Sequence, residues 1–397
     1  MKENIKMDIS GKVMTVKGVI DPSDLKKTIT HEHFFIDLRK SHLPHQPLIY
    51  TKNKSNSEKQ STEFTPLSNL ADEDVLFPKI TSFPSESIEV DFPATELNLW
   101  DAKVDFGNLH LAKDRAPIAD NYILSDVNLA IKEALEFKNN GGSTVVDVTN
   151  RGLKRDPEAL LKLSEATGLN IIMGSSWYQK MFHPRDMDDK SVENLTDEIV
   201  EDVTVGVNGT GIKSGIIGEV GVNGGPITRN EEKCIISAAI GSKLTGAPIT
   251  IHSGGVGEEK HHTLDLIEKE GVSLNRVIMG HSDWLADNYE FALELIDRNV
   301  FLEFDLIGRE SALEISPTAK DIQIITKLVQ DGHEDKILLS QDVCHKSNLK
   351  HYGGFGYSFV LEKFIPHLHS LGISNSSTDK MLIENPKKIL QFIEPVH

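Results

Sequence analysis

The sequence predicts a single (β/α)8 barrel, an α/β fold in which parallel strands alternate with helices. Three observations support this prediction. Eight short apolar runs recur along the 397 residues, segments with a helical pattern lie between them, and residues of metal-binding types follow the C-terminal ends of several runs. Active sites of such barrels lie at the C-terminal ends of the strands. The predicted fold and the predicted site therefore support each other.

The strand-like runs number eight, which is the number that this barrel requires. They cover residues 27–30, 143–148, 170–174, 215–220, 248–251, 276–279, 300–306 and 337–339. Helical patterns follow the second, fourth and sixth runs, in PEALLKLSEATG, EEKCIISAAIGSKLTG and YEFALELIDRN. Their Gly or Asn endings are typical of helix C-termini. Strands that alternate with helical segments indicate βαβ units and a parallel sheet.

Two regions depart from this alternation. Residues of about 50–111 are rich in Ser, Thr, Asn, Pro and acidic side chains without a sustained period, which predicts a long irregular insertion in the first βα loop. It either covers the mouth of the barrel or is a surface insertion without function. The C-terminal segments YSFVLEKFIPHLHSLG and ENPKKILQFI predict two helices that finish the outer ring. No second domain is indicated, so residues 1–397 form one predicted domain.

The composition is that of a globular protein, with 39% apolar and 26% charged residues. Nothing approaches the roughly 18 consecutive apolar residues of a membrane-spanning helix, and the N-terminus carries no signal-like apolar segment. Two cysteines suit a reducing compartment, so we expect a cytoplasmic protein. A net charge of −18 disfavours nucleic acid as a partner. We expect a small-molecule substrate and no membrane partner.

Six residues of metal-binding types follow the strand-like runs. The first run ends in His31-Glu32-His33, and alternate residues of a strand point to the same side, so both imidazoles face one point. Glycines flank Glu219 in GIIGEVG and indicate that another part of the backbone approaches closely there. The remaining four members follow the fourth, fifth, sixth and last runs in the order Glu219, His252, His281 and Asp342.

Imidazole and carboxylate ligands suit zinc and its first-row neighbours, and a carboxylate that bridges two ions is a known arrangement for activating water. A single histidine after a strand is more often a core or capping residue. However, chance placement of 16 histidines would put one or two at strand ends, not four with two carboxylates. We therefore predict that the site binds two divalent ions, both zinc, and that a hydroxide bridging these ions is the nucleophile. Asp342 is the predicted catalytic proton acceptor, which passes the proton to the leaving group.

These residues stand in motifs that resemble the phosphotriesterase family of the amidohydrolase superfamily, and within it the animal phosphotriesterase-related branch. The matching segments extend from about residue 10 to the C-terminus, except in the insertion, and are TITHEHFF, GLKRD, GIIGEVG, PITIHSGG, VIMGHSDW, LEFDLIG, ILLSQDV, HYGGFGYSF and MLIENPKKIL.

The resemblance implies a role for each of the six residues. His31 and His33 with Asp342 would hold the more buried ion, His252 and His281 the more exposed one, and Glu219 would bridge them. The best-known bacterial phosphotriesterases use a carbamylated lysine as the bridge, whereas the related branch resembles this sequence in having glutamate. This difference weakens the transfer of organophosphate activity. Members of the family are often dimers, so a homodimer is a further expectation.

The resemblance implies hydrolysis of small anionic N-acyl amino acids or N-acetyltaurine-like amides. A lactonase or phosphotriesterase is the alternative for the same site, because the hydroxide attack would be shared. A metal-dependent deoxyribonuclease is disfavoured by the acidic charge and by the HYGGFGYSF segment. A barrel that binds metal without turnover is the other alternative, and the complete set of six residues argues against it.

Two residues outside this set are candidates for contacting the substrate. Tyr178 follows the third run, although an aromatic residue there is as often simple packing. Arg309 follows the seventh run, and its planar guanidinium suits a carboxylate or sulfonate. A solvated surface arginine is the alternative.

Overall fold

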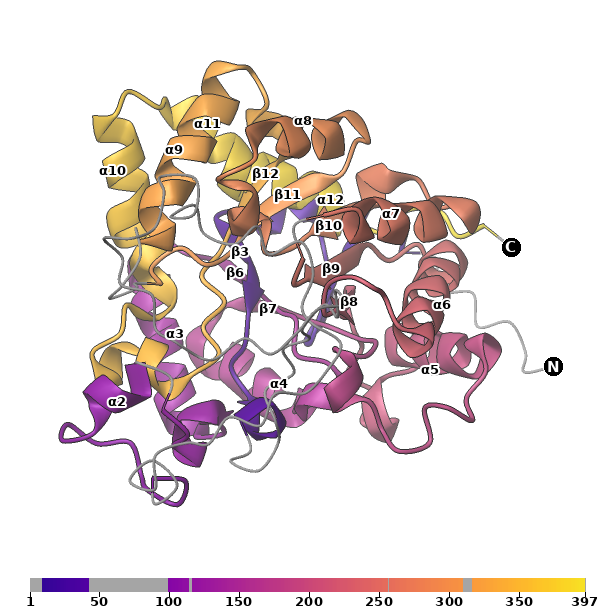
Figure 1. The fold of residues 1–397 in the computed structure, drawn as a ribbon, viewed down its shortest axis with the longest axis horizontal. Helices are drawn as coiled ribbons and strands as arrows, with labels where there is room; N and C mark the ends of the chain where they lie inside the picture. Colours follow the sequence, from indigo (N-terminus) through magenta and orange to yellow (C-terminus); the bar gives the residue numbers. More distant parts are fainter. Residues whose placement is uncertain (1–8, 43–98, 114–115, 256, 310–315, 397) are drawn as a thin grey trace, which may run out of the picture.

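Eight parallel strands form the centre of the fold, and the helices surround them (Figure 1). The computed structural model describes residues 9–42, 99–113, 116–255, 257–309 and 316–396. Each of the eight predicted runs contains or overlaps one strand of the barrel. These strands are β3 (Thr28–Glu32), β6 (Thr144–Asp147), β7 (Asn170–Met173), β8 (Ile217–Val222), β9 (Ile249–Ser253), β10 (Val277–Met279), β11 (Phe301–Phe304) and β12 (Ile337–Leu339).

The strands close into a barrel through two seams. One sheet has the order β12-β11-β10-β9-β8 and the other β3-β6-β7, all parallel. Between β7 and β8, the Gly215 amide donates to the Met173 carbonyl at 2.9 Å. Between β12 and β3, the Asp342 amide donates to the His31 carbonyl at 3.1 Å. The predicted (β/α)8 barrel is therefore confirmed.

The helices lie around the strands (Figure 1). Those predicted after the second, fourth and sixth runs are present, and the first two end at Gly168 and Gly246 in the left-handed conformation that glycine favours. The α-helices are α2 (Leu109–Lys113), α3 (Val127–Asn139), α4 (Pro157–Thr167), α5 (Val192–Thr204), α6 (Arg229–Thr245), α7 (Glu259–Lys269), α8 (Tyr289–Asp297), α9 (Pro317–Gln330), α10 (Ile365–Ser370), α11 (Asn375–Asp379) and α12 (Asn385–Leu390).

Alternation along the strands separates two apolar layers. In β10, Val277 and Met279 pack with the outer helices, whereas Ile278 packs with apolar residues of other strands. In β12, Leu338 belongs to the same inner cluster as Ile278. The hairpin of β1 (Val13–Thr15) and β2 (Gly18–Ile20) adds Val13 to this cluster. Apolar side chains thus fill one part of the barrel interior, while polar side chains gather at the C-terminal ends of the strands.

The first βα connection contains a short antiparallel pair, β4 (Ile36–Asp37) with β5 (Ile123–Leu124). Most of the predicted insertion of 50–111 lies outside the described residues, and 99–111 lie within them. Val104, in this part, packs with Ala112 and Ile118, which follow it, in a small apolar cluster. The irregular insertion as a whole stays a prediction. Among the helices that the structure describes, none has the length and apolar character needed to cross a membrane.

Candidate metal centre

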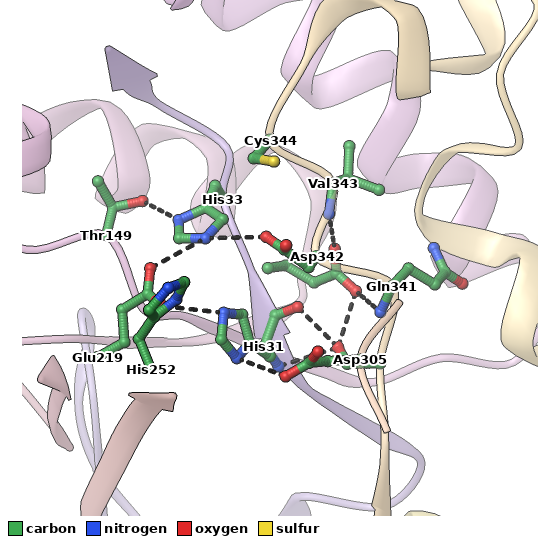
Figure 2. Close-up of polar contacts among 12 residues, drawn as sticks. His31, His33, Thr149, Glu219, His252, Asp305, Gln341, Asp342, Val343 and Cys344 are labelled. Carbon is green, nitrogen blue, oxygen red and sulfur yellow. Dashed lines mark hydrogen bonds and ion pairs between the residues drawn. The ribbon is translucent and has the colours of Figure 1, made fainter. Parts of the chain in front are cut away.

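The two histidines of the first strand converge on one carboxylate. His31 lies in β3 and His33 follows its last residue, and the two imidazole centroids are 5.6 Å apart. The Nε2 atom of His31 lies 3.4 Å from Glu219 Oε2, and that of His33 lies 3.4 Å from Glu219 Oε1. The predicted convergence of the two rings is therefore present in the structure (Figure 2).

Glu219 is buried at the centre of this group, on β8. Two glycines allow its strand to approach its neighbours closely. A Cβ on Gly218, whose φ is +133°, would lie 2.2 Å from the Thr250 carbonyl, and one on Gly221 would lie 2.1 Å from the Gln179 amide nitrogen. Burial alone would raise the pKa of Glu219, but the facing imidazole of His31 and the hydrogen bond with His252 hold this pKa well below its usual range.

The other two histidines meet beside the same carboxylate. His252 lies in β9, and its Nδ1 is 3.0 Å from Glu219 Oε2. His281 follows β10 at a φ of +52°, and its Nε2 lies 2.6 Å from His252 Nδ1. Burial and the neighbouring His281 lower the pKa of His252 to about 4, so that its ring is neutral near pH 7. A neutral ring has the free lone pair that a metal requires.

Asp342 closes the group from the end of β12. It has a φ of +45°, a strained conformation for a residue other than glycine. Its Oδ1 lies 3.2 Å from His33 Nε2, and its Oδ2 lies 2.5 Å from an Arg309 Nη atom. Burial would raise the pKa of Asp342, but Arg309 and His33 lower it below its usual range. The carboxylate is therefore ionised and able to accept a proton.

Each of the four imidazoles directs one ring nitrogen towards the other possible metal ligands. Its second ring nitrogen contacts a residue outside these six. The outer contacts are His31 Nδ1 to Asp305 at 3.0 Å, His33 Nδ1 to Thr149 Oγ1 at 2.9 Å, His281 Nδ1 to Asp305 at 2.7 Å, and His252 Nε2 to Tyr178 Oη at 3.3 Å and to Gln179 Nε2 at 2.7 Å. Such outer contacts orient metal-binding histidines and set which nitrogen is free.

The six residues form two compact sets of possible ligand atoms. One is His31, His33 and Asp342, and the other is Glu219, His252 and His281. The buried Nε2 atom of His31 has no hydrogen-bond partner in the structure, and it faces Glu219 Oε2 at 3.4 Å. A cation bound between this ring nitrogen and the carboxylate would satisfy the buried nitrogen. The donor set therefore fits a metal ion.

Asp305 has a structural role that the sequence reasoning missed. It follows β11 and contacts the outer nitrogens of both His31 and His281, and its Oδ2 also accepts from the His281 amide at 2.9 Å. A third set of possible ligand atoms consists of these three residues. Because it uses the outer nitrogens, we interpret Asp305 as the residue that orients two rings. Asp305 lies inside the predicted seventh run of 300–306, so the strand-end pattern that indicated the six candidates did not indicate it; the strand of the structure ends at Phe304.

We expect Asp305→Asn to weaken metal binding by about 10- to 100-fold, because contacts of this kind orient the ligands and raise their basicity. Zinc affinity, measured by competition with a chromophoric chelator, tests this expectation. Asp287→Asn is the matched control, since Asp287 pairs with Lys320 and its side chain is 75% exposed. Equal affinities for Asp305→Asn and the unsubstituted protein would contradict the orienting role.

Glu32, between His31 and His33, is a second residue that sequence reasoning missed. Its side chain is buried and accepts hydrogen bonds from the amides of Gln341 and Val343, both at 2.9 Å, and from Ser340 Oγ at 2.8 Å. Glu32 thereby anchors the segment that carries Asp342 to the first strand. Strand alternation predicted only that its side chain points away from the two imidazoles.

The two predicted substrate residues both border the group. Tyr178 is half-buried and stacks edge-on against His252, with ring centroids 4.6 Å apart. Arg309 is half-buried and donates to the Asp342 carbonyl at 2.7 Å and to Cys344 Sγ at 3.1 Å. Its buried Nε has no hydrogen-bond partner among the described residues. The structure thus places both residues beside the possible ligands, while contact with a substrate stays a prediction.

Lys260 is a buried cation near this group that the sequence analysis did not identify. It lies in α7, and its Nζ donates to Ser253 Oγ, next to His252, at 2.6 Å. Burial lowers the pKa of Lys260 from 10.5 to about 8, although Glu259 and Asp305 oppose the shift. Between these two pH values the unfolded chain binds a proton that the folded chain has lost. Stability must therefore rise with pH across this window.

We expect the free energy of unfolding of the unsubstituted protein, relative to Lys260→Met, to rise by about 3 kcal/mol from pH 8 to pH 10.5. Urea unfolding of the metal-free proteins across that range measures the difference. Lys12→Met, at an exposed lysine paired with Asp21, is the control and should follow the unsubstituted protein. Parallel pH profiles for Lys260→Met and the unsubstituted protein would refute the charge burial.

Comparisons with known proteins show the family to which the chain is similar. The family model described as the phosphotriesterase family matches residues 11–390. The N-acetyltaurine hydrolase of Dictyostelium discoideum is 31% identical over 398 residues, which cover 97% of this chain and 99% of the relative. The human N-acetyltaurine hydrolase is 31% identical over 392 residues, with the same coverages. A crystal structure of a resiniferatoxin-binding protein from Rhodobacter sphaeroides superposes with a TM-score of 0.79 at 29% identity, over 96% of this chain and 95% of that one.

Proposed function

Because this chain belongs to the phosphotriesterase family, we propose that it is a dinuclear metal hydrolase that cleaves the amide bond of small anionic N-acyl compounds such as N-acetyltaurine. The observation that carries the metal part of the proposal is the common orientation of the four histidines, each with one nitrogen towards Glu219, Asp342 or a neighbouring ring. The amide part is supported by the relatives named N-acetyltaurine hydrolase.

The two ions would be held by the two sets of three residues described above. His31 and His33 with Asp342 would bind one, His252 and His281 the other, and Glu219 would lie between them. Two divalent ions, of zinc in this proposal, would supply an activated water and would polarise the substrate carbonyl. Side chains of this protein would carry out the remaining steps.

Asp342 is the proposed proton acceptor and donor. Its carboxylate lies at the edge of the group beside His33, it is ionised, and Arg309 holds it from the other side. It would take the proton of the attacking water and give it to the amide nitrogen as the C–N bond breaks. Asp305 and Thr149 would hold the rings of His31, His33 and His281 in place during this transfer.

Arg309 is the proposed contact for the acidic group of the substrate. Its Nε–H is buried and has no partner among the described residues, while its Nη2 contacts Asp342 and Cys344. An unsatisfied guanidinium N–H beside the base would donate a hydrogen bond to a carboxylate or sulfonate oxygen. Tyr178, next to His252, would line the same space. A small-molecule substrate, the absence of a nucleic-acid or membrane partner, a cytoplasmic location and a homodimer belong to this proposal.

The proposal is tested by assaying zinc-loaded protein on N-acetyltaurine, N-acetyl amino acids, a lactone and an aryl phosphotriester. We expect amide hydrolysis that a chelator abolishes and added zinc restores. Turnover of the lactone or phosphotriester alone would replace the amide assignment with an ester one. Amide hydrolysis that persists after complete metal removal would overturn the metal part.

A further inference from the structure

A basic cavity lies beside the proposed metal centre. It has a volume of about 670 Å³ and is lined by residues that follow β3, β4, β6 and β7. Its basic lining residues are Arg39, Lys40, Arg151, Lys154 and Lys190, and its acidic ones are Asp37 and Glu198. None of the six possible metal ligands lines it. It is therefore a separate space at the same end of the barrel.

The charge of this cavity opposes that of the whole chain. Five cationic and two acidic side chains leave a formal excess of three positive charges in the lining, in a chain with a net charge of −18. Clustered charge of one sign in a concave site focuses the electrostatic field and attracts counter-ions. The cavity is therefore suited to an anion, although most of the protein would repel one.

The two carboxylates in the lining hold four of these cations in place, and two carboxylates outside the lining also pair with two of them, Asp202 with Arg151 at 2.7 Å and Asp186 with Lys190 at 3.6 Å. Asp37 pairs with both Arg39, at 2.8 Å, and Lys154, at 2.5 Å. Glu198 pairs with both Arg151, at 3.0 Å, and Lys190, at 2.7 Å. Each carboxylate thus serves two cations. Positioning of this kind lowers the entropy lost when a ligand binds.

The same cavity has an aromatic wall. Trp100 and Trp177 line it, and the guanidinium of Arg151 lies 5.8 Å from the centre of the Trp177 ring. Phe182 also lines it and packs against Tyr178, with ring centroids 5.2 Å apart. Tyr178 in turn contacts His252. Phe182 and Tyr178 thus separate the cavity from the metal centre. Trp100, which is half-buried, offers apolar surface to a ligand, whereas Trp177 and Phe182 are each only 2% exposed.

From this combination we propose that the cavity is a second binding site, for a small organic anion that carries two negative charges and a planar apolar group. The cations would pair with the acidic group and Trp100 would contact the planar part. The volume lies within the range of small-molecule sites, which is roughly 300–1,000 Å³. The site requires no metal and no turnover, so it stands apart from the proposed hydrolysis.

Tryptophan fluorescence tests this proposal directly. The chain has three tryptophans, and Trp284→Phe removes the one that follows His281, leaving the two that line the cavity. Phenyl phosphate is the probe, with inorganic phosphate for its charge alone and phenol for its ring alone. We expect phenyl phosphate to change the emission of the Trp284→Phe protein, metal-loaded or metal-free, and to bind more tightly than either fragment.

Lys40→Gln with Lys154→Gln, at two exposed cavity lysines, should weaken phenyl phosphate binding at least about tenfold. Lys12→Gln with Lys327→Gln, at exposed lysines elsewhere that pair with Asp21 and Asp331, is the matched control and should leave binding unchanged. Unchanged affinity in the cavity variant, a signal that vanishes when the metal is removed, or no signal at all would each overturn the second site. Amide hydrolysis is measured separately, so that either proposal can fail alone.

Discussion

Glu219→Gln is expected to abolish hydrolysis and to release metal. The carboxylate of Glu219 contacts His31, His33 and His252 at 3.0 to 3.4 Å, so that this buried negative charge belongs to one set of possible ligands and faces two histidines of the other. Glutamine keeps the shape but removes this charge. The loss of several kcal/mol of electrostatic stabilisation corresponds to a fall in kcat/KM of about three orders of magnitude or more.

Zinc content by elemental analysis and amide turnover by product detection test this expectation together. Glu231→Gln is the matched control, because Glu231 is also buried but accepts hydrogen bonds from Thr228 at the start of α6, a role that glutamine can fill. The control should retain zinc and activity. Full zinc content with undiminished turnover in Glu219→Gln would remove this residue from the centre of the mechanism.

The second large effect is expected from Asp342→Asn, which should lower kcat by about 10²- to 10⁴-fold, the range for loss of a general acid or base. Asparagine cannot accept the proton that the proposed mechanism assigns to this carboxylate. The set of Glu219, His252 and His281 is left intact, so that metal should remain bound there. The combination of retained metal with lost turnover distinguishes a proton-transfer role from a purely ligating one.

Arg309→Gln separates this effect from the loss of an ion pair. Asp342 lies 2.5 Å from Arg309, so Asp342→Asn also weakens that contact. Arg309→Gln removes the same contact but keeps the carboxylate, and it should raise KM for an anionic substrate more than it lowers kcat. If Arg309→Gln lowered kcat as strongly as Asp342→Asn, proton transfer by Asp342 would no longer be needed to explain the result.

Most of the barrel could be predicted from local patterns. Strands such as β8 and β9 are buried on both faces, so that they appear in the sequence as short apolar runs, and helices such as α4 and α6 carry their own caps and terminal glycines. The strand ends were less predictable. β3 continues to Glu32 and β11 ends at Phe304, because pairing with the neighbouring strands decides where a strand ends.

The six possible metal ligands could be found from sequence because a (β/α)8 barrel brings the ends of all its strands together. The residues around them could not be found in this way. Asp305 and Glu32 act through contacts with residues far away in the chain, Asp305 with His31 and Glu32 with the amides beside Asp342. Lys260 contacts Ser253 across the loop between β9 and α7. No local pattern records which buried polar side chains will meet.

The order of strands, helices and possible ligands along the chain was therefore determined by the sequence alone, since each follows from short-range periodicity and from the position of a residue relative to a strand end. Tertiary structure alone decided which nitrogen of each histidine faces Glu219, how Asp305 orients two rings, and where basic side chains from separate loops surround a cavity. These features depend on side chains that are distant in sequence and become neighbours only when the barrel closes.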